Sequence, residues 1–278
     1  MALIVEHAGF AYNAGRGFEN LALSGIDMVV EPGSLTLVLG PTGSGKSTLL
    51  RLASGLVDAT AGGVTVDGEV MSTSARKRLR GRVGLVFQNP ESQFFAPTVL
   101  DDVAFGPRNL GRARPEDDAR EAMRQVGLDP DEFGERTPFE LSGGEARRAA
   151  VAGVLAMCPD YLLLDEPSAG LDARGREAVR AAVAATRERA GVVIVTHEAG
   201  DFLASADHVL VLSGGTSAFS GTPSEMLSAG ASLPAGVRLP DVPRAMLLAA
   251  DRTGAAVEPT LDPLEAARAL AAMVGGPR

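Results

Sequence analysis

Four short runs of almost unbroken apolar residues dominate the hydrophobic pattern of the chain. They occupy residues 35–39, 83–87, 161–164 and 192–195. Strands that are covered on both faces of a parallel sheet carry such continuous apolar runs. Between two of the runs, helical spacing connects Ala119, Ala122, Met123 and Val126, and Gly127 marks the end of that helix. Helices that alternate with buried strands predict an α/β fold with a mostly parallel core sheet.

The two ends of the chain have a different texture. Near the N-terminus, short alternating segments are separated by glycines, which predicts an antiparallel β-subdomain. Residues 63–68 add a further strand and turn. From about Thr222 onward, prolines punctuate short helices that are rich in Ala and Leu. We therefore predict a main domain over residues 1–221 and a small C-terminal helical appendage over residues 222–278.

A glycine-rich segment follows the first apolar run and matches the phosphate-binding pattern G-x-x-x-x-G-K-[ST]. The segment and the threonine after it comprise Gly40, Pro41, Thr42, Gly43, Ser44, Gly45, Lys46, Ser47 and Thr48. Its glycines let backbone N–H groups turn around an anion, and the start of the next helix adds partial positive charge. In such a loop Lys46 reaches the β- and γ-phosphates, and the Ser47 hydroxyl binds Mg²⁺. We predict a site for Mg-ATP here, rather than a glycine-rich turn without a ligand.

Two acidic residues end the third apolar run. Asp165 would hold the Mg²⁺ shell, directly or through water, and Glu166 would orient or deprotonate the attacking water. On its own, the pair is also typical of two surface acids at a turn. Together with the glycine-rich loop, it predicts ATP hydrolysis.

Several polar groups follow directly after predicted parallel strands. Gly40, Gln88, the pair Asp165 and Glu166, and His197 all stand at such positions. Because ligands bind at the carboxyl ends of strands in an open α/β sheet, we expect these groups to converge on the loop. We predict that His197 contacts the γ-phosphate rather than serving as a core residue.

Composition narrows the classes of function. The formal net charge is −9, which disfavours a nucleic-acid partner because a phosphate backbone demands a basic surface. Lys46 and Lys77 are the only lysines, so a lysine in the glycine-rich loop stands out. Cys158 is the single cysteine, which excludes an intrachain disulfide and fits a reducing compartment. We see no signal-peptide pattern and no apolar run of membrane-spanning length, so a role at a membrane would need a partner.

Further segments make the chain resemble the ATP-binding cassette (ABC) family over about residues 3–223. The segment Leu141, Ser142, Gly143, Gly144 and Glu145 is similar to the family signature LSGGQ. Residues 168–172, which end in Asp172, resemble the D-loop. Gln88 and His197 resemble the Q-loop glutamine and the switch histidine. Tyr12 stands where the family keeps an aromatic residue that stacks on adenine, and the alternative is an ordinary strand aromatic.

This resemblance implies a P-loop ATPase of ABC type with a helical signature subdomain over about residues 89–160. In the family two cassettes meet head to tail, and each ATP lies between one P-loop and the signature of the partner. The resemblance also implies that Gln88 joins Ser47 and Asp165 as a metal ligand. Glu145 replaces the usual glutamine, so its carboxylate should weaken one half-site and allow an asymmetric pair. Ser142 and Glu145 also fit a capping box, and that structural role is compatible with the functional one.

A narrower resemblance lies between the Q-loop and the signature. Residues 87–95, which include Pro90, Glu91 and Ser92, and residues 98–107 are similar to ATPases of energy-coupling-factor importers for vitamins or for cobalt and nickel ions. It implies a homo- or heterodimer at the cytoplasmic face of the membrane, bound to a transmembrane coupling protein and a substrate-binding membrane component. The appendage would then match the dimerising tail of such subunits. In a chain poor in aromatics, Phe94 and Phe95 are expected to contact the core or this partner rather than a solvated loop.

Three alternatives stay open at this point. The chain could serve another importer or exporter class, which shares all of the chemistry above. A cytosolic cassette protein of DNA repair or translation usually has coiled-coil insertions or two cassettes, and neither is visible in the sequence. A nucleotide sensor without turnover would lack the carboxylate or the histidine, and both are present. The transported substrate is not encoded in these motifs.

Overall fold

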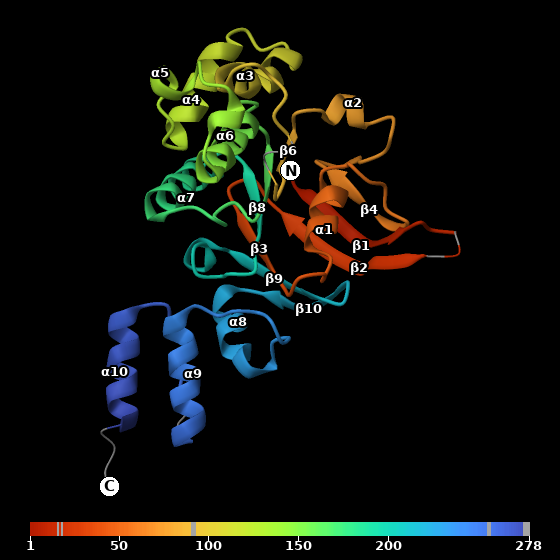
Figure 1. Cartoon of the computed structure of the whole chain (residues 1–278). Coiled ribbons are helices and arrows are strands. Elements are labelled where there is room, and N and C mark those ends of the chain that lie inside the picture. The colour runs from red at the N-terminus through yellow and green to blue at the C-terminus, as the bar shows by residue number, and fades with distance from the viewer. Residues whose placement is uncertain (16, 18, 90–92, 255–256, 275–278) are drawn as a thin grey trace.

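The computed structural model describes the whole chain except residues 16, 18, 90–92, 255–256 and 275–278 (Figure 1). Pro90, Glu91 and Ser92, which the sequence comparison singled out, therefore lie outside the described residues. The strands are β1 (Leu3–Tyr12), β2 (Asn20–Val30), β3 (Leu35–Leu39), β4 (Ala61–Val66), β5 (Glu69–Val70), β6 (Val83–Val86), β7 (Tyr161–Asp165), β8 (Gly191–Val195), β9 (His208–Ser213) and β10 (Thr216–Gly221).

The helices alternate with these strands in the middle of the chain and continue without them at its C-terminal end. They are α1 (Lys46–Ala53), α2 (Arg76–Leu79), α3 (Val99–Asn109), α4 (Pro115–Gln125), α5 (Pro130–Phe133), α6 (Gly143–Leu155), α7 (Ala173–Arg187), α8 (Pro223–Ala229), α9 (Asp241–Thr253) and α10 (Pro263–Val274). Short 3₁₀ turns cover Pro138–Glu140, Leu203–Ser205 and Gly230–Ser232.

The core sheet has the strand order β10-β9-β3-β8-β7-β6. Its strands from β9 to β6 pair in parallel, and β10 adds an antiparallel edge. Every residue of β3, β7 and β8 is buried. The mostly parallel core predicted from the apolar runs is confirmed, because strands covered on both faces need apolar side chains at every position.

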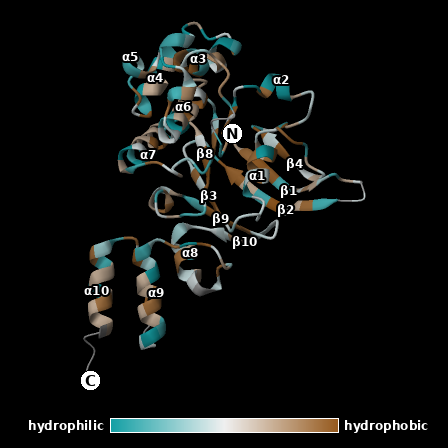
Figure 2. Ribbon diagram, viewed as in Figure 1, coloured by the Kyte–Doolittle hydropathy of each residue, from teal (hydrophilic) through white to brown (hydrophobic). Residues whose placement is uncertain are grey.

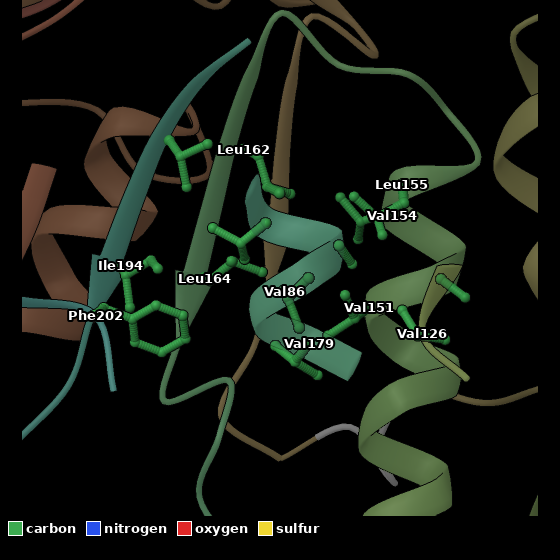
Figure 3. Packing of buried hydrophobic residues seen from close by; sticks show 14 of the residues in the cluster. Val86, Val126, Val151, Val154, Leu155, Leu162, Leu164, Val179, Ile194 and Phe202 are labelled. Atoms are coloured by element: carbon green, nitrogen blue, oxygen red, sulfur yellow. The ribbon is translucent and has the colours of Figure 1, made fainter. Parts of the chain in front are cut away.

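Alternate side chains of the core strands enter two hydrophobic clusters, one on each face of the sheet. Leu37 belongs to the cluster covered by α3, α4, α6 and α7, whereas Val38 belongs to the cluster shared with α1 and the N-terminal strands. In the first cluster, Leu164 of β7 lies close to Val151 of α6 and Val179 of α7 (Figure 3). The sheet is thereby held between helices on one face and a second sheet with α1 on the other.

The N-terminal strands form an antiparallel sheet of order β2-β1-β4-β5, as predicted. Its first two strands are longer than the short segments we expected, because register shifts let one strand continue through the interruptions. One such shift surrounds His7, whose φ is 45°. A Cβ on Gly62 would lie 2.2 Å from the Glu6 oxygen and 2.3 Å from the His7 oxygen, so β4 can pair with β1 at this irregular position only with glycine.

After β10 the chain forms helices α8, α9 and α10. Helices α9 and α10 lie side by side below the core (Figure 1), and both mix hydrophilic and hydrophobic positions along their length (Figure 2). Pro243 and Met246 are the buried residues of α9. Within the described residues, no helix combines the length and the apolarity that a membrane crossing requires. The division at residue 222 coincides with the start of α8, but a separate domain there stays a prediction.

Candidate active site

A cavity of about 420 Å³ lies at the carboxyl ends of the core strands. The residues predicted from the sequence that line it are Tyr12, Thr42, Gly43, Gly45, Lys46, Ser47, Thr48, Gln88, Asp165, Glu166 and His197. The fold therefore brings together groups from four separate strand ends, as the position of each after its strand indicated. Neither the segment Leu141–Glu145 nor Asp172 lines this cavity.

The glycine-rich loop between β3 and α1 is shaped by close backbone approaches. A Cβ on Gly40 would lie 2.3 Å from the Leu212 oxygen, and one on Gly45 would lie 2.7 Å from the Ala22 oxygen. Both glycines also have positive φ angles. Ser44 Oγ is buried and has no hydrogen-bond partner among the described residues. An unpaired buried hydroxyl is costly, and a phosphate oxygen held by this loop would pair with it.

Lys46 begins α1 and is only 9% exposed. Its Nζ donates to the carbonyl oxygens of Gly40 at 2.8 Å and Pro41 at 2.9 Å. Burial lowers the pKa of Lys46, and the Glu166 and Asp165 carboxylates oppose that shift. An ammonium has three N–H donors, so these two bonds leave a third for a phosphate oxygen.

Asp165 ends β7 beside Ser47, and both residues line the cavity. The pKa of Asp165 lies above its usual value, mainly because the side chain is buried. The Glu166 charge raises this pKa further, and interaction with the Ser47 side chain opposes the shift. The described residues hold no cluster of three or more His, Cys, Asp or Glu side chains of metal-binding type. A hydroxyl with one carboxylate nevertheless fits Mg²⁺, which takes few protein ligands and completes its shell with phosphate and water oxygens.

Glu166 is 7% exposed and is fixed at both its side chain and its backbone. Its carboxylate accepts a hydrogen bond from Thr196 Oγ1 at 3.0 Å and contacts His197 Nδ1 at 2.8 Å. Its backbone N–H donates to the Val195 oxygen at 2.8 Å. The φ of Glu166 is 51°, a left-handed conformation that non-glycine residues rarely adopt and that is found at functional sites.

His197 lies in the cavity, and its contact there is with Glu166 rather than with the loop. In the tautomer with a proton on Nδ1, His197 can donate to the Glu166 carboxylate, which only accepts hydrogen bonds when it is ionised. The imidazole is 47% exposed, and Nε2 is 3.8 Å from Glu198 Oε1. The predicted contact between His197 and a γ-phosphate stays a prediction.

Sequence reasoning missed two residues that hold Glu166. Thr196 contacts the carboxylate, and its position directly after the apolar run of β8 was a usable signal. Arg147 of α6 donates to the Glu166 carbonyl oxygen through Nη1 at 2.5 Å and to the Gln88 carbonyl oxygen through Nη2 at 2.9 Å. No spacing rule connects an arginine on a helix with two distant strand ends, so the fold alone identifies it.

Tyr12 lies at the rim of the cavity, where its hydroxyl is 3.1 Å from Thr48 Oγ1. Its ring meets Phe10 edge to face, with centroids 4.8 Å apart. Stacking of Tyr12 on adenine stays a prediction.

The signature segment lies at the N-terminus of α6. Ser142 caps this helix, and the Ser142–Glu145 capping box expected from the sequence is present. Asp172 likewise caps α7, with Oδ1 accepting from the Gly175 N–H at 2.7 Å. Since neither segment reaches the cavity of its own chain, any contact with nucleotide would have to be with that of another cassette.

A segment after α8 returns to the site from the C-terminal side. Glu198, next to His197, forms a parallel β-bridge with Arg238. A Cβ on Gly236 would lie 3.0 Å from the Pro41 Cβ of the glycine-rich loop. The C-terminal part of the chain therefore contacts both the loop and the end of β8.

Several known proteins are similar to this chain over most of its length. A sequence profile described as "ABC transporter" matches residues 23–169. The "Energy-coupling factor transporter ATP-binding protein EcfA2" of Streptococcus sanguinis strain SK36 is 46% identical over 233 residues, which is 81% of this chain and 83% of that protein. The EcfA2 protein of Bacillus licheniformis is 44% identical over 232 residues, which is 81% of this chain and 79% of that protein.

Solved structures agree with this relationship. The structure of cbiO1 from Clostridium perfringens, described as part of the ABC transporter complex cbiONQ, superposes with a TM-score of 0.71 at 30% identity, covering 88% of this chain and 98% of that one. A dimeric bacterial ABC transporter cassette superposes with a TM-score of 0.72 at 25% identity, covering 80% of this chain and 98% of that one. The chain therefore belongs to the ABC transporter family, as an ATP-binding cassette that resembles the energy-coupling-factor ATPases.

Proposed function

We propose that this cassette binds Mg-ATP in the cavity beside the P-loop and hydrolyses it with Glu166 to power an importer of the energy-coupling-factor type. One observation carries the assignment. The buried Glu166 carboxylate is held by Thr196 and His197 in the same cavity as Lys46 and the glycine-rich loop. A general base fixed beside a phosphate cradle is the arrangement that nucleotide hydrolysis requires.

The residues of the chain divide this work between binding and proton transfer. The loop amides and Lys46 would hold the β- and γ-phosphates, while Thr196 and His197 orient the Glu166 carboxylate toward the attacking water. Glu166 would orient that water or take its proton. Because both carboxylate oxygens already accept hydrogen bonds, the carboxylate has little freedom to turn away from the water.

Ser47 and Asp165 would hold Mg²⁺ in the same cavity, and Gln88 from the neighbouring strand end would be a further ligand. When bound, the ion would neutralise charge that develops on the phosphate oxygens. Ser47 follows Lys46 at the start of α1, and Asp165 ends β7, so the fold brings the two ligands to the same cavity.

The proposed assembly contains a second cassette, identical or related, and membrane partners. The relatives are named as ATP-binding proteins of energy-coupling factor transporters, and the cbiO1 neighbour is part of the complex cbiONQ. These names support a place for this chain in a transporter assembly. The cytoplasmic face of the membrane, and a vitamin or a cobalt or nickel ion as cargo, belong to the proposal through the resemblance of the segment between the Q-loop and the signature. Co-purification of a coupling membrane protein and a small substrate-binding membrane protein would support this class, and a different set of membrane partners would favour another transporter class.

The test is Glu166→Gln in the assembled transporter, compared with Lys46→Ala. Because Gln keeps the shape of the side chain but cannot take a proton, we expect turnover to fall by at least about a hundredfold while ATP affinity changes little. Lys46→Ala should instead weaken ATP binding itself. Hydrolysis is measured by phosphate release and affinity by equilibrium titration with Mg-ATP. Unchanged turnover in the Glu166 variant would refute the assignment.

A further inference from the structure

Arg147 joins three parts of the molecule that are far apart in sequence. It lies in the second turn of α6, the helix whose N-terminus carries the signature segment. Its Nη1 donates to the Glu166 carbonyl oxygen at the end of β7, and its Nη2 donates to the Gln88 carbonyl oxygen just after β6. One side chain therefore connects the signature helix with two segments that line the nucleotide cavity.

The geometry of guanidinium makes this connection stiff. Its N–H donors form a rigid planar fork, so the two carbonyl oxygens that Arg147 binds are held at a fixed separation. The Glu166 backbone needs such support, because a non-glycine residue with a φ of 51° is in a strained, left-handed conformation. The Val195 carbonyl binds the N–H of Glu166 on one side, and Arg147 binds its carbonyl oxygen on the other.

The same helix carries the residues expected to meet the nucleotide of a second cassette. Ser142 caps α6, and Arg147 follows five residues later, about 7.5 Å along the helix axis. An α-helix of this length moves as a rigid body, so a displacement of its N-terminus reaches the guanidinium directly. We propose that Arg147 is a positioning residue that transmits engagement of the signature with the partner's nucleotide to Glu166 and Gln88 in its own site. This inference rests on the proposed function.

Arg148 offers a matched control on the same helix. Its Nη1 also donates to two carbonyl oxygens, those of Val126 at 3.1 Å and Gly127 at 2.7 Å. These acceptors lie at the end of α4, and neither lines the cavity. Replacement of Arg148 removes a comparable pair of hydrogen bonds from α6 without touching Glu166 or Gln88.

The experiment compares Arg147→Ala, Arg147→Lys and Arg148→Ala in the assembled transporter. We expect Arg147→Ala to lower kcat for ATP by about tenfold or more, with KM within about threefold of the unaltered protein, because Arg147 supports the Glu166 backbone and does not line the cavity. A lysine has a single ammonium and cannot bridge both carbonyls, so Arg147→Lys should restore only part of kcat. Arg148→Ala should lower the melting temperature about as much as Arg147→Ala does. Its kcat should nevertheless stay within about twofold of that of the unaltered protein.

A double-mutant cycle with Ser142→Ala separates transmission from local support. If Arg147 acts on Glu166 through engagement of the signature with the partner's nucleotide, its loss should add nothing once Ser142 is also replaced. The variant with both Ser142→Ala and Arg147→Ala should then have a kcat no lower than that of the slower single variant. Multiplicative losses would show that the two residues act independently and would overturn the proposal, as would an unchanged kcat in both Arg147 variants. If Arg147→Ala does not fold, the lysine variant carries the same cycle. Failure of the unaltered assembly to hydrolyse ATP would instead refute the proposed function, before this question arises.

Discussion

At the scale of single residues, Glu145 stands where the family signature usually has glutamine, and its carboxylate is fixed by Ser142. The Ser142 N–H and the Ser142 hydroxyl both donate to Glu145 Oε2, at 2.8 and 2.7 Å. Hydrogen bonds from the side chain and then from the backbone of Ser142 hold the pKa of Glu145 below its usual value, so the carboxylate is charged at neutral pH. A negative charge therefore sits at the helix N-terminus that a partner's γ-phosphate would approach, and it occupies the hydroxyl that would bind it.

Replacement Glu145→Gln should strengthen engagement of a second cassette's nucleotide. Glutamine can still close a capping box, but it removes the carboxylate charge that would repel an approaching γ-phosphate. We expect the apparent KM for ATP in the assembly to fall by about twofold to fivefold. Glu225→Gln is the control, because Glu225 accepts from the Thr222 N–H at 2.7 Å and the Thr222 hydroxyl at 2.9 Å in an equivalent box on α8. Equal effects of the two variants on KM would contradict the role of Glu145.

At the scale of elements, the sequence predicted what depends on local pattern. The strands β3, β7 and β8 were found because burial on both faces requires an apolar residue at every position. The gathering of Lys46, Asp165 and His197 followed from the rule that parallel strands end at one edge. The full lengths of β1 and β2 were not predicted, because bulges hide the alternation, and Arg147 was not found, because its partners are set by tertiary packing.

A partly buried hydrogen bond connects the two sheets at the end opposite the cavity. Tyr161 of β7 is fully buried, and its hydroxyl donates at 2.6 Å to Asp67 Oδ1, in the turn after β4. Asp67 also pairs with Arg82, which bonds Asp160 through Nε at 2.7 Å. Burial alone would raise the pKa of Asp67, but the hydrogen bonds from Tyr161 and Arg82 outweigh it and hold the pKa below its usual value.

We expect Tyr161→Phe to lower the free energy of unfolding by about 1–3 kcal/mol, because the hydrogen bond is made to a charged group. A carboxyl with a lowered folded-state pKa stabilises the fold above its unfolded pKa and loses that contribution as pH falls below about 4. The loss caused by Tyr161→Phe should therefore be present at neutral pH and shrink in acid. Denaturant titrations at several pH values measure it. Arg82 pairs with two carboxylates, and that of Asp160 is the more exposed. Asp160→Asn should therefore lower the free energy of unfolding by less than about 1 kcal/mol. A loss equal to that of Tyr161→Phe would argue against the importance of the Tyr161–Asp67 hydrogen bond.

At the scale of the whole molecule, the C-terminal segment is tied to the nucleotide site. Arg238 bridges to Glu198, which follows His197, and Gly236 lies against Pro41 of the glycine-rich loop. The chain thus returns from α8 to the loop that would hold the phosphates before it enters α9. A motion of helices α9 and α10 relative to the core would therefore displace the glycine-rich loop through this segment.

Gly236→Ala tests that connection, with Gly254→Ala as the control. Both glycines have positive φ angles, 95° and 69°, so alanine at either position adds backbone strain of about 1 kcal/mol. At Gly236 the added methyl meets the loop, 3.0 Å from the Pro41 Cβ, whereas a Cβ on Gly254 would meet no atom of the described residues within 4 Å. We therefore expect Gly236→Ala to raise the Kd for Mg-ATP by about threefold to tenfold and Gly254→Ala to leave it unchanged. Equilibrium titration of both purified variants decides the matter, because strain alone would affect their stability alike and would leave both nucleotide affinities equal.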